Sequence, residues 1–245
     1  INSISGTDLT FPSRLQEIPQ RPKHLYSVGT LPKYTLGVAL VGTRKPTGYG
    51  RQVTADLASR LAERGAVIVS GLAHGVDGIA HEATLKVGGT TIAVLPSGLD
   101  QIYPSAHRNL ANRIVEQGGA LVSEYAPGTP PLQYRFLERN RLVSGLADIV
   151  IVTEASIRSG TMNTTMHALE QGRDVYAVPG PITGAMSAGC NALIAQGAAP
   201  IIDIEQFVEQ LFQPPRLLLL REAEHLQDGE DVLLDGQLAE DGGLL

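Results

Sequence analysis

The sequence has very little cysteine, because Cys190 is the single one and has no second cysteine with which to form an internal disulfide. This excludes a disulfide-stapled secreted scaffold and two-cysteine redox chemistry, so a reducing cytoplasm is the expected environment. No apolar run approaches the roughly 18–20 residues of a membrane-spanning helix, and the first residues lack the basic-then-apolar pattern of a secretion signal. We therefore expect a cytoplasmic protein with no membrane partner.

A net positive charge is also lacking, because the formal net charge is −6 at pH 7. The acidic residues are unevenly placed: eight of the 25 follow Arg221, whereas all 19 lysines and arginines lie at or before it. Residues 1–221 therefore carry a net charge of +2. A polyanion responds to the place where basic side chains converge, so the overall charge does not exclude a nucleic-acid partner.

Short apolar runs rich in β-branched residues alternate with helical patterns from about residue 36 onward. The runs are continuous, which is typical of strands covered on both faces. The alternation predicts an α/β fold, with an extended, Rossmann-like, doubly wound and mainly parallel sheet. We expect strands at 36–42, 66–70, 90–95, 120–123, 148–153, 174–178 and 199–203, and helices over 50–64, 76–87, 106–116, 138–146, 160–171, 187–196 and 204–212.

The pattern divides the chain into three segments. Residues 1–35 are proline-rich and are expected to form an irregular lead-in. Residues 36–212 hold the Rossmann-like domain. Residues 213–245 begin at a proline pair and are glycine-rich and acidic, which predicts a linker with an acidic tail, or the remnant of a small C-terminal domain.

The loops that follow the strands are where a parallel sheet binds its ligands. After the first strand, Gly42, Thr43 and Arg44 precede a helix, whose free amide hydrogens and forked guanidinium suit a phosphate. The fingerprints G-x-G-x-x-G and G-x-x-x-x-G-K-[ST] are both absent, so we expect neither a dinucleotide nor an ATP-type cofactor. An ordinary strand–helix turn with a solvated arginine is the alternative.

The second strand ends at Ser70 and Gly71, in a segment that resembles a second anion cradle. The same segment contains candidate metal ligands, but the order H-E-x-x-H is missing and no third ligand follows at a recognisable spacing. We interpret these side chains as polar groups near a turn and predict no metal site. They are His74, Asp77, His81 and Glu82.

Two later loops also carry basic residues. After the fourth strand, arginines alternate with aromatic residues, which fits a nucleic-acid surface on which rings stack on bases; an amphipathic helix with a charged face is the alternative. After the fifth strand, Arg158, Ser159 and Gly160 begin a helix with another anion-binding pattern. The residues after the fourth strand are Tyr134, Arg135, Phe136, Arg139, Asn140 and Arg141.

A row of such cradles along one sheet edge indicates a polymer rather than a mononucleotide. We find no G-x-S-x-G elbow, no cysteine–histidine pair and no carboxylate cluster at metal spacing beside them. We therefore expect a binding protein rather than an enzyme.

Six segments in order resemble the DNA-processing protein A (DprA, also called Smf) family, over about residues 10–212. They are "VGTRKPTGYG", "VSGLAHGVDGIAHEATL", "AVLPSGLDQIYPSAH", "LVSEYAPGTPPLQYRFLERNRLVSGLAD", "VTEASIRSGTMNTTMHALEQGRDVYAVPG" and "SAGCNALIAQGA". The resemblance implies an extended Rossmann domain that binds single-stranded DNA without a cofactor, protects incoming strands and loads the RecA recombinase during natural transformation. It also implies a homodimer, for which helices over 187–212 are the surface that we consider.

The family's DNA-contacting residues correspond to a defined set of positions here. The family's basic residue in the motif Y-P-[KR] is replaced by Ser105, with His107 and Arg108 close by. The resemblance implies DNA contacts at Gly42, Thr43, Arg44, Ser70, Gly71, Ala73, Arg139, Asn140, Arg141, Ser159 and Gly160.

An enzyme is the alternative function. Rossmann-like nucleotide phosphoribohydrolases use similar cradles together with the run P-G-G-x-G-T-x-x-E and a catalytic glutamate. The comparable segment here is "RSGTMNTTMHALE", in which Thr165 or Met166 stands near the position of the acid and Glu170 lies further along. A Rossmann protein that senses a nucleotide without turning it over is a third possibility.

Overall fold

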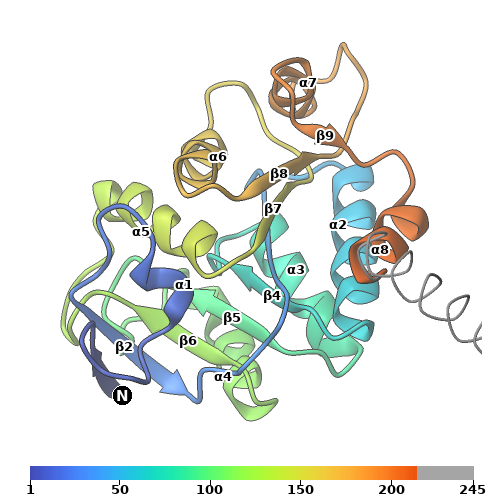
Figure 1. The fold of residues 1–245 in the computed structure, drawn as a ribbon. Coiled ribbons are helices and arrows are strands. Elements are labelled where there is room, and N and C mark those ends of the chain that lie inside the picture. Colours follow the sequence, from blue (N-terminus) through green and yellow to red (C-terminus); the bar gives the residue numbers. More distant parts are fainter. Residues whose placement is uncertain (214–245) are drawn as a thin grey trace, which may run out of the picture. The chain divides into compact units, whose positions relative to one another are not determined.

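A nine-stranded sheet is the centre of the fold in the computed structural model, which describes residues 1–213 (Figure 1). Residues 1–205 form one compact unit. The strand order is β1-β2-β6-β5-β4-β3-β7-β8-β9, and β2–β6 and β1–β2 are the antiparallel pairs. The strands are β1 (Asn2–Ser5), β2 (His24–Gly29), β3 (Gly37–Val41), β4 (Val67–Ser70), β5 (Thr91–Val94), β6 (Ala120–Ser123), β7 (Ile149–Val152), β8 (Asp174–Ala177) and β9 (Ala199–Pro200).

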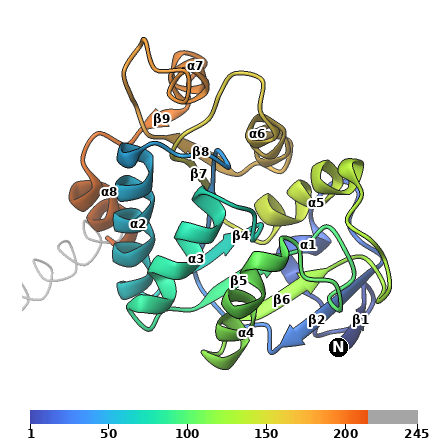
Figure 2. The same cartoon turned by 180° about the vertical axis from the view of Figure 1, so that it is seen from behind.

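Helices connect the parallel strands and pack on both faces of the sheet. Those after β3, β4 and β5 share one face and contact one another in sequence, whereas α5 and α6 pack together on the opposite face (Figures 1 and 2). The predicted doubly wound, mainly parallel α/β fold is confirmed. The helices are α1 (Ser13–Gln16), α2 (Gly48–Glu63), α3 (Val76–Lys86), α4 (Arg108–Glu116) with the short 3₁₀ turn η1 (Ser105–His107) before it, α5 (Gln133–Gly145), α6 (Gly160–Glu170), α7 (Ala188–Ala195) and α8 (Ile204–Phe212).

The order of the strands creates a switch point between β3 and β7. From this point, β4, β5 and β6 follow β3 in order toward one edge of the sheet, and β8 and β9 follow β7 toward the other edge. The connections after the neighbouring strands β3 and β7 therefore leave toward opposite faces of the sheet. A crevice forms at such a point beyond the carboxyl ends of the strands, because the two loops separate there. The loops after Val41 and Val152 are therefore the place to look for a ligand site.

The expectation of an irregular segment over residues 1–35 is wrong. Strand β2 lies antiparallel to β6, with Val28 opposite Leu121, and β1 pairs with β2 in turn. Leu15 of α1 and Leu25 of β2 are fully buried. The proline-rich pattern did not predict these short elements, because the stability of the elements comes from packing on a distant part of the chain. The predicted acidic tail, apart from Gln213, lies outside the described residues.

Helix α5 begins earlier than the sequence predicts. The expected helix covered 138–146, whereas α5 spans Gln133–Gly145. Pro130 and Pro131 keep the preceding backbone extended, and the chain becomes helical directly after Leu132. Tyr134, Arg135 and Phe136 therefore stand on the same helix as Arg139, Asn140 and Arg141. Among the described residues, no helix combines the length and apolarity needed to cross a membrane.

His81 is buried in the contact between α3 and the sheet. The Thr91 hydroxyl donates to the Ile68 carbonyl at 2.6 Å, so it accepts from His81 Nδ1, at 2.7 Å. His81 Nε2 is buried and has no partner. Burial, with smaller contributions from the positive charges of His107 and Arg139, lowers the pKa of His81 to about 3 from its ordinary 6.5.

The lowered pKa of His81 predicts that the protein loses stability in mild acid. Between its pKa values of 6.5 in the unfolded chain and about 3 in the fold, only the unfolded chain binds the proton. The free energy of unfolding therefore falls as the pH drops below 6.5, by up to about 1.4 kcal/mol per pH unit. Urea denaturation at about pH 7 and about pH 5 measures this slope. The variant His81→Gln is expected to have a smaller slope than the parent, and equal slopes would contradict the assignment.

Candidate nucleic-acid interface

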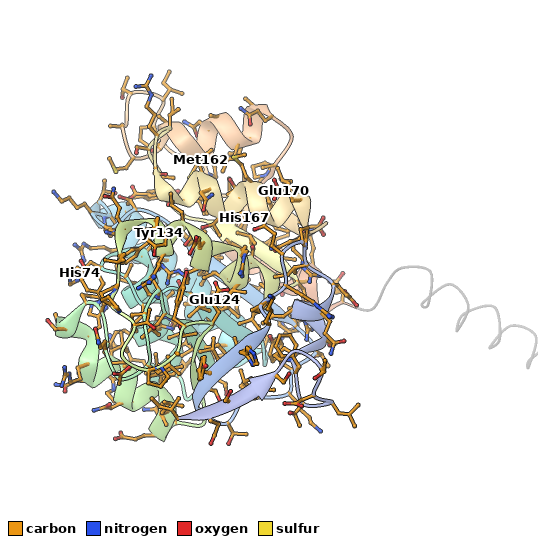
Figure 3. All side chains as sticks on the ribbon, turned by 90° about the vertical axis from the view of Figure 1, so that its left-hand side faces the viewer. His74, Glu124, Tyr134, Met162, His167 and Glu170 are labelled. Atoms are coloured by element: carbon orange, nitrogen blue, oxygen red, sulfur yellow. The ribbon has the colours of Figure 1, made fainter. Side chains whose placement is uncertain are left out.

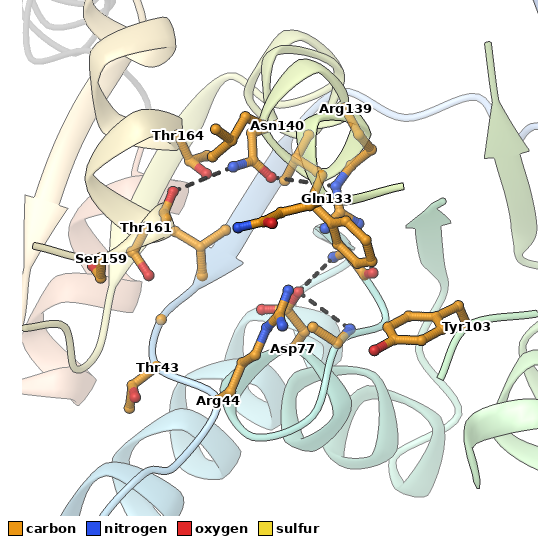
Figure 4. Close-up of a pocket in the computed structure, with 18 of the residues that line it drawn as sticks. Thr43, Arg44, Asp77, Tyr103, Gln133, Arg139, Asn140, Ser159, Thr161 and Thr164 are labelled. Atoms are coloured by element: carbon orange, nitrogen blue, oxygen red, sulfur yellow. Dashed lines mark hydrogen bonds between the residues drawn. The ribbon is translucent and has the colours of Figure 1, made fainter. Parts of the chain in front are cut away.

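A cavity of about 630 Å³ opens at the switch point, between the carboxyl ends of β3 and β4 and the helices α5 and α6 (Figure 4). The loops after three different strands thus meet at one place, as the sequence predicts. Of the residues expected to bind DNA, all except Ser70 and Arg141 line this cavity: Gly42, Thr43, Arg44, Gly71, Ala73, Arg139, Asn140, Ser159 and Gly160.

Arg44 provides the exposed positive charge of the cavity. It follows β3, and its guanidinium carbon lies 5.2 Å from the centre of the Phe136 ring on α5. The Phe136 ring in turn meets Tyr103 edge to face, with ring centres 5.3 Å apart. A cation over an aromatic face is held in place while its outer edge stays available to a second partner. One side of the cavity therefore combines a phosphate-binding group with aromatic surface.

Arg139 is a different kind of arginine. Its side chain is 4% exposed, and Nη1 donates to the carbonyls of Gly71 and Val94 at 2.6 and 2.5 Å. A Cβ on Gly71 would lie 2.3 Å from that nitrogen, so only glycine allows this approach. Burial lowers the pKa of Arg139 to about 10, against the opposing effect of Asp77, and the group stays charged at neutral pH. Arg139 thus braces α5 against the ends of β4 and β5.

Two carboxylates of the protein accept hydrogen bonds from backbone amides that we expected, from the sequence, to bind an anion. Asp77 accepts from the amides of Gly71 and Ala73 at 3.1 and 3.4 Å. Glu154 accepts from the Thr47 amide at 2.8 Å and from its hydroxyl at 2.6 Å. Burial raises the pKa of Asp77, and the charge of Arg139 opposes this rise. The loops after β3 and β4 are therefore stabilised by the protein's own acids.

The N-terminus of α6 is the part of the cavity that remains open to an anion. The first turn of a helix leaves its amide hydrogens without intrahelical partners. Ser159 precedes the helix, and its buried hydroxyl has no partner. The side-chain amide of Asn140 donates to the Gly160 carbonyl at 3.2 Å and to Asn163 Oδ1 at 3.1 Å, which fixes this turn to α5. The region above Gly160 is empty, because a Cβ there would meet nothing within 4 Å.

The two predicted residues outside the cavity have structural partners. Ser70 is fully buried and donates to the Leu40 carbonyl at 2.6 Å. Arg141 pairs with Glu124 at 2.5 Å, and the two side chains are 12% and 16% exposed. Burial raises the pKa of Glu124, against the opposing effect of Arg141. Arg141 points away from the cavity because it is two residues beyond Arg139 on the same helix, about 200° around its axis.

The metal candidates of the second loop have separate partners. Asp77 accepts from backbone amides, His81 pairs with Thr91, and Glu82 forms an ion pair with Arg113 at 2.8 Å. His74 stacks edge to face on His107, with ring centres 4.8 Å apart. Within residues 1–213, no three potential ligands gather into a metal site.

Several lining residues were not proposed as site residues from the sequence. They lie on the loop after β5 and on α5 and α6, where only the tertiary fold brings them to the cavity. A usable signal was the aromatic content of the α5 segment, in which Tyr134 is also 52% exposed (Figure 3). The missed residues include Tyr103, Gln133, Leu137, Thr161 and Thr164.

A crevice with a helix N-terminus and an exposed arginine, at the switch point of a doubly wound sheet, is typical of Rossmann-like proteins with anionic ligands. The family model of DNA recombination-mediator protein A matches residues 2–212. The chain belongs to this family, and the resemblance indicated by the sequence motifs is confirmed.

Relatives with curated names extend the comparison. The chain is 45% identical to Protein Smf of Escherichia coli over 202 residues, which are 82% of this chain and 54% of that protein. It is 40% identical to DNA processing protein DprA of Bacillus subtilis over 213 residues, 86% of this chain and 71% of that protein. The chain thus spans about half the length of the Escherichia coli relative.

Solved structures share the same architecture. DNA processing protein A from Streptococcus pneumoniae superposes with a TM-score of 0.76 at 41% identity, over 83% of this chain and 72% of that one. DNA processing protein A from Helicobacter pylori, studied for its single-stranded DNA binding mode, has a TM-score of 0.75 at 36% identity, over 85% and 98% of the two chains.

Proposed function

We propose that this chain binds single-stranded DNA without sequence preference. The observation that carries the proposal is one cavity in which Arg44, the open N-terminus of α6 and the rings of Tyr103 and Phe136 lie together. Phosphates need the first two, and unpaired bases need aromatic surface. The single-stranded DNA binding mode described for the Helicobacter pylori protein supports this proposal.

We propose a role for each of these parts of the cavity. Arg44 holds a phosphate with its forked donors, and the amides of the first turn of α6, which begins at Gly160, hold a second one. Tyr103 and Phe136 offer faces and edges to bases of any kind. Because Arg139 is occupied by backbone carbonyls, it supports the site and does not read base edges.

The biological role follows from family membership. We infer that the chain protects incoming single strands and loads the RecA recombinase onto them during natural transformation, as a homodimer in the cytoplasm. The architecture that the chain shares with DNA processing protein A from Streptococcus pneumoniae supports this inference. The single cysteine, Cys190, is buried and fits a reducing compartment.

Binding without turnover is part of the proposal. In the segment compared with the phosphoribohydrolases, Thr165 is buried and donates to the Met162 carbonyl, and Glu170 is an exposed partner of His167 at 3.4 Å (Figure 3). Asp77 and Glu154 are both engaged by backbone amides. Incubation with AMP is expected to release no adenine, and release above a protein-free control would favour the enzyme.

A mobility-shift titration tests the main proposal. The protein is mixed with single-stranded and with double-stranded DNA of the same sequence, over a series of salt concentrations. Single strands are expected to bind more tightly, and the affinity should fall steeply with salt because phosphate contacts release counterions. Equal affinity for the duplex, or binding that does not respond to salt, would overturn the proposal.

The empty region above Gly160 gives a prediction that separates binding from stability. Leucine at position 160 is expected to fill part of the cavity and to weaken binding of oligothymidylate about tenfold. The fold should keep its melting temperature, because nothing lies within 4 Å of the new Cβ and leucine is the better helix former. Gly48→Leu is the matched control, since Gly48 also begins a helix, has equally free space and lies outside the cavity. Unchanged binding by Gly160→Leu would place the strand elsewhere.

A further inference from the structure

A second cavity, of about 550 Å³, lies beside the first one, on the face of the sheet that carries α2, α3 and α4. Its walls come from α2, from α3 and from the η1 turn with the start of α4. Its volume is close to that of the first cavity. We refer to it as the lateral groove, lined among others by Arg51, His74, Gly78, Lys86, His107 and Arg113.

The lateral groove is basic. Arg44, Arg51, Lys86 and Arg113 line it, and Glu82 is the one acidic residue among the lining residues. Glu82 is paired with Arg113 at 2.8 Å, so three positive charges are left over. Arg51 and Lys86 are exposed, on α2 and at the end of α3. Such an excess of charge in a concave surface attracts an anion.

The lateral groove adjoins the first cavity at Arg44, which lines both. Gly75 brings the two walls together: its φ is +80°, and a Cβ there would lie 2.7 Å from the Arg44 Cα. The loop before α3 is therefore packed directly against the backbone of Arg44. The lateral groove is therefore within reach of a strand that is held at Arg44.

Two histidine rings form a fixed part of the groove. His107 Nδ1 lies 2.8 Å from the Leu72 carbonyl, which can only accept, so Nδ1 carries the proton. A Cβ on Gly78 would lie 2.8 Å from the His107 ring, which shows how closely the ring packs on α3. His74 is exposed (Figure 3). Its ring meets the ring of His107 edge to face. The rings give the groove flat surface beside its cations.

We propose that the lateral groove is a second binding segment for the same DNA strand, which runs from the first cavity over Arg44 to Arg51 and Lys86. This inference rests on the proposed function. A strand is the expected occupant because two adjoining basic cavities share one arginine, which matches the regular repeat of charge along a polynucleotide and exceeds what one mononucleotide needs. The groove contacts the backbone, so it adds affinity without adding sequence preference.

A length series of oligothymidylates, from about four to about sixteen nucleotides, tests the groove by fluorescence anisotropy. The variant Arg51→Glu/Lys86→Glu is expected to bind the shortest oligonucleotides like the parent and the longest about tenfold more weakly. Its salt slope with the longest should be smaller by about 1.4, for two lost phosphate contacts. The control Arg21→Glu/Lys23→Glu makes the same change of charge at exposed residues outside both cavities and should match the parent.

The outcomes separate the two proposals. If the groove variant binds long oligonucleotides like the parent, or loses short and long ones equally, or behaves like the control, the lateral groove is not part of the strand's path. If the parent binds no oligonucleotide, or if Arg44→Ala has no effect on any length, the proposed function itself fails. Thermal melting of both double variants confirms that the changes leave the fold intact.

Discussion

Replacing Arg44 by alanine is expected to weaken single-stranded DNA binding about tenfold to a hundredfold, for all sequences alike. Arg44 is the exposed arginine of the cavity and stands between it and the lateral groove. A hydrogen bond to a charged group contributes about 1.5–3 kcal/mol, and about 1.4 kcal/mol is a factor of ten in affinity. The loss should be similar for oligomers of different sequence, because a phosphate contact carries no base information.

Filter binding with oligo-dT and with a mixed-sequence strand measures this effect. The salt slope of the variant should be smaller by about 0.7, for one lost contact on a single strand. Arg44→Lys should retain part of the affinity, since it keeps the charge and loses the fork. Arg21→Ala is the control, because Arg21 is exposed and lines neither cavity. If Arg44→Ala binds oligo-dT as tightly as the parent at moderate salt, the assigned site is wrong.

Replacing Arg139 by methionine is expected to destabilise the fold by about 3–5 kcal/mol. The change leaves the carbonyls of Gly71 and Val94 without their donor and removes the cation that faces buried Asp77. In a domain of this size the melting temperature falls by about 2–4 °C per kcal/mol, so a drop of about 6–20 °C is expected. Its effect on DNA binding should follow from this loss of structure.

Calorimetry or circular dichroism on heating measures the drop, with Arg108→Met as the control at an exposed arginine that begins α4. The double variant Arg139→Met/Asp77→Asn should recover part of the stability, because it removes the buried charge that the single variant leaves unpaired. If Arg139→Met melted like the parent and still lost DNA binding, Arg139 would be a direct ligand and the bracing role would be refuted.

The local pattern of the chain was enough to predict which loops line the candidate site. Continuous β-branched runs, such as the one that ends at Val41, can only be strands covered on both faces, and the helices between them require right-handed parallel crossovers. The loops after these strands must then meet at one edge of the sheet. Arg44 was assigned in this way because it lies in the loop after the first predicted strand, and Gly160 because it begins the helix after the fifth.

The tertiary structure alone decided how each of these residues is used. Asp77 and Glu154 occupy the amides of two loops, Arg139 turns inward to the ends of β4 and β5, and Arg141 faces Glu124. Each contact joins groups far apart in the chain or depends on the exact rotation of a helix, which residue spacing leaves free. The sequence by itself therefore determined which loops converge, and the packing of distant elements decided which of their polar groups are left for a ligand.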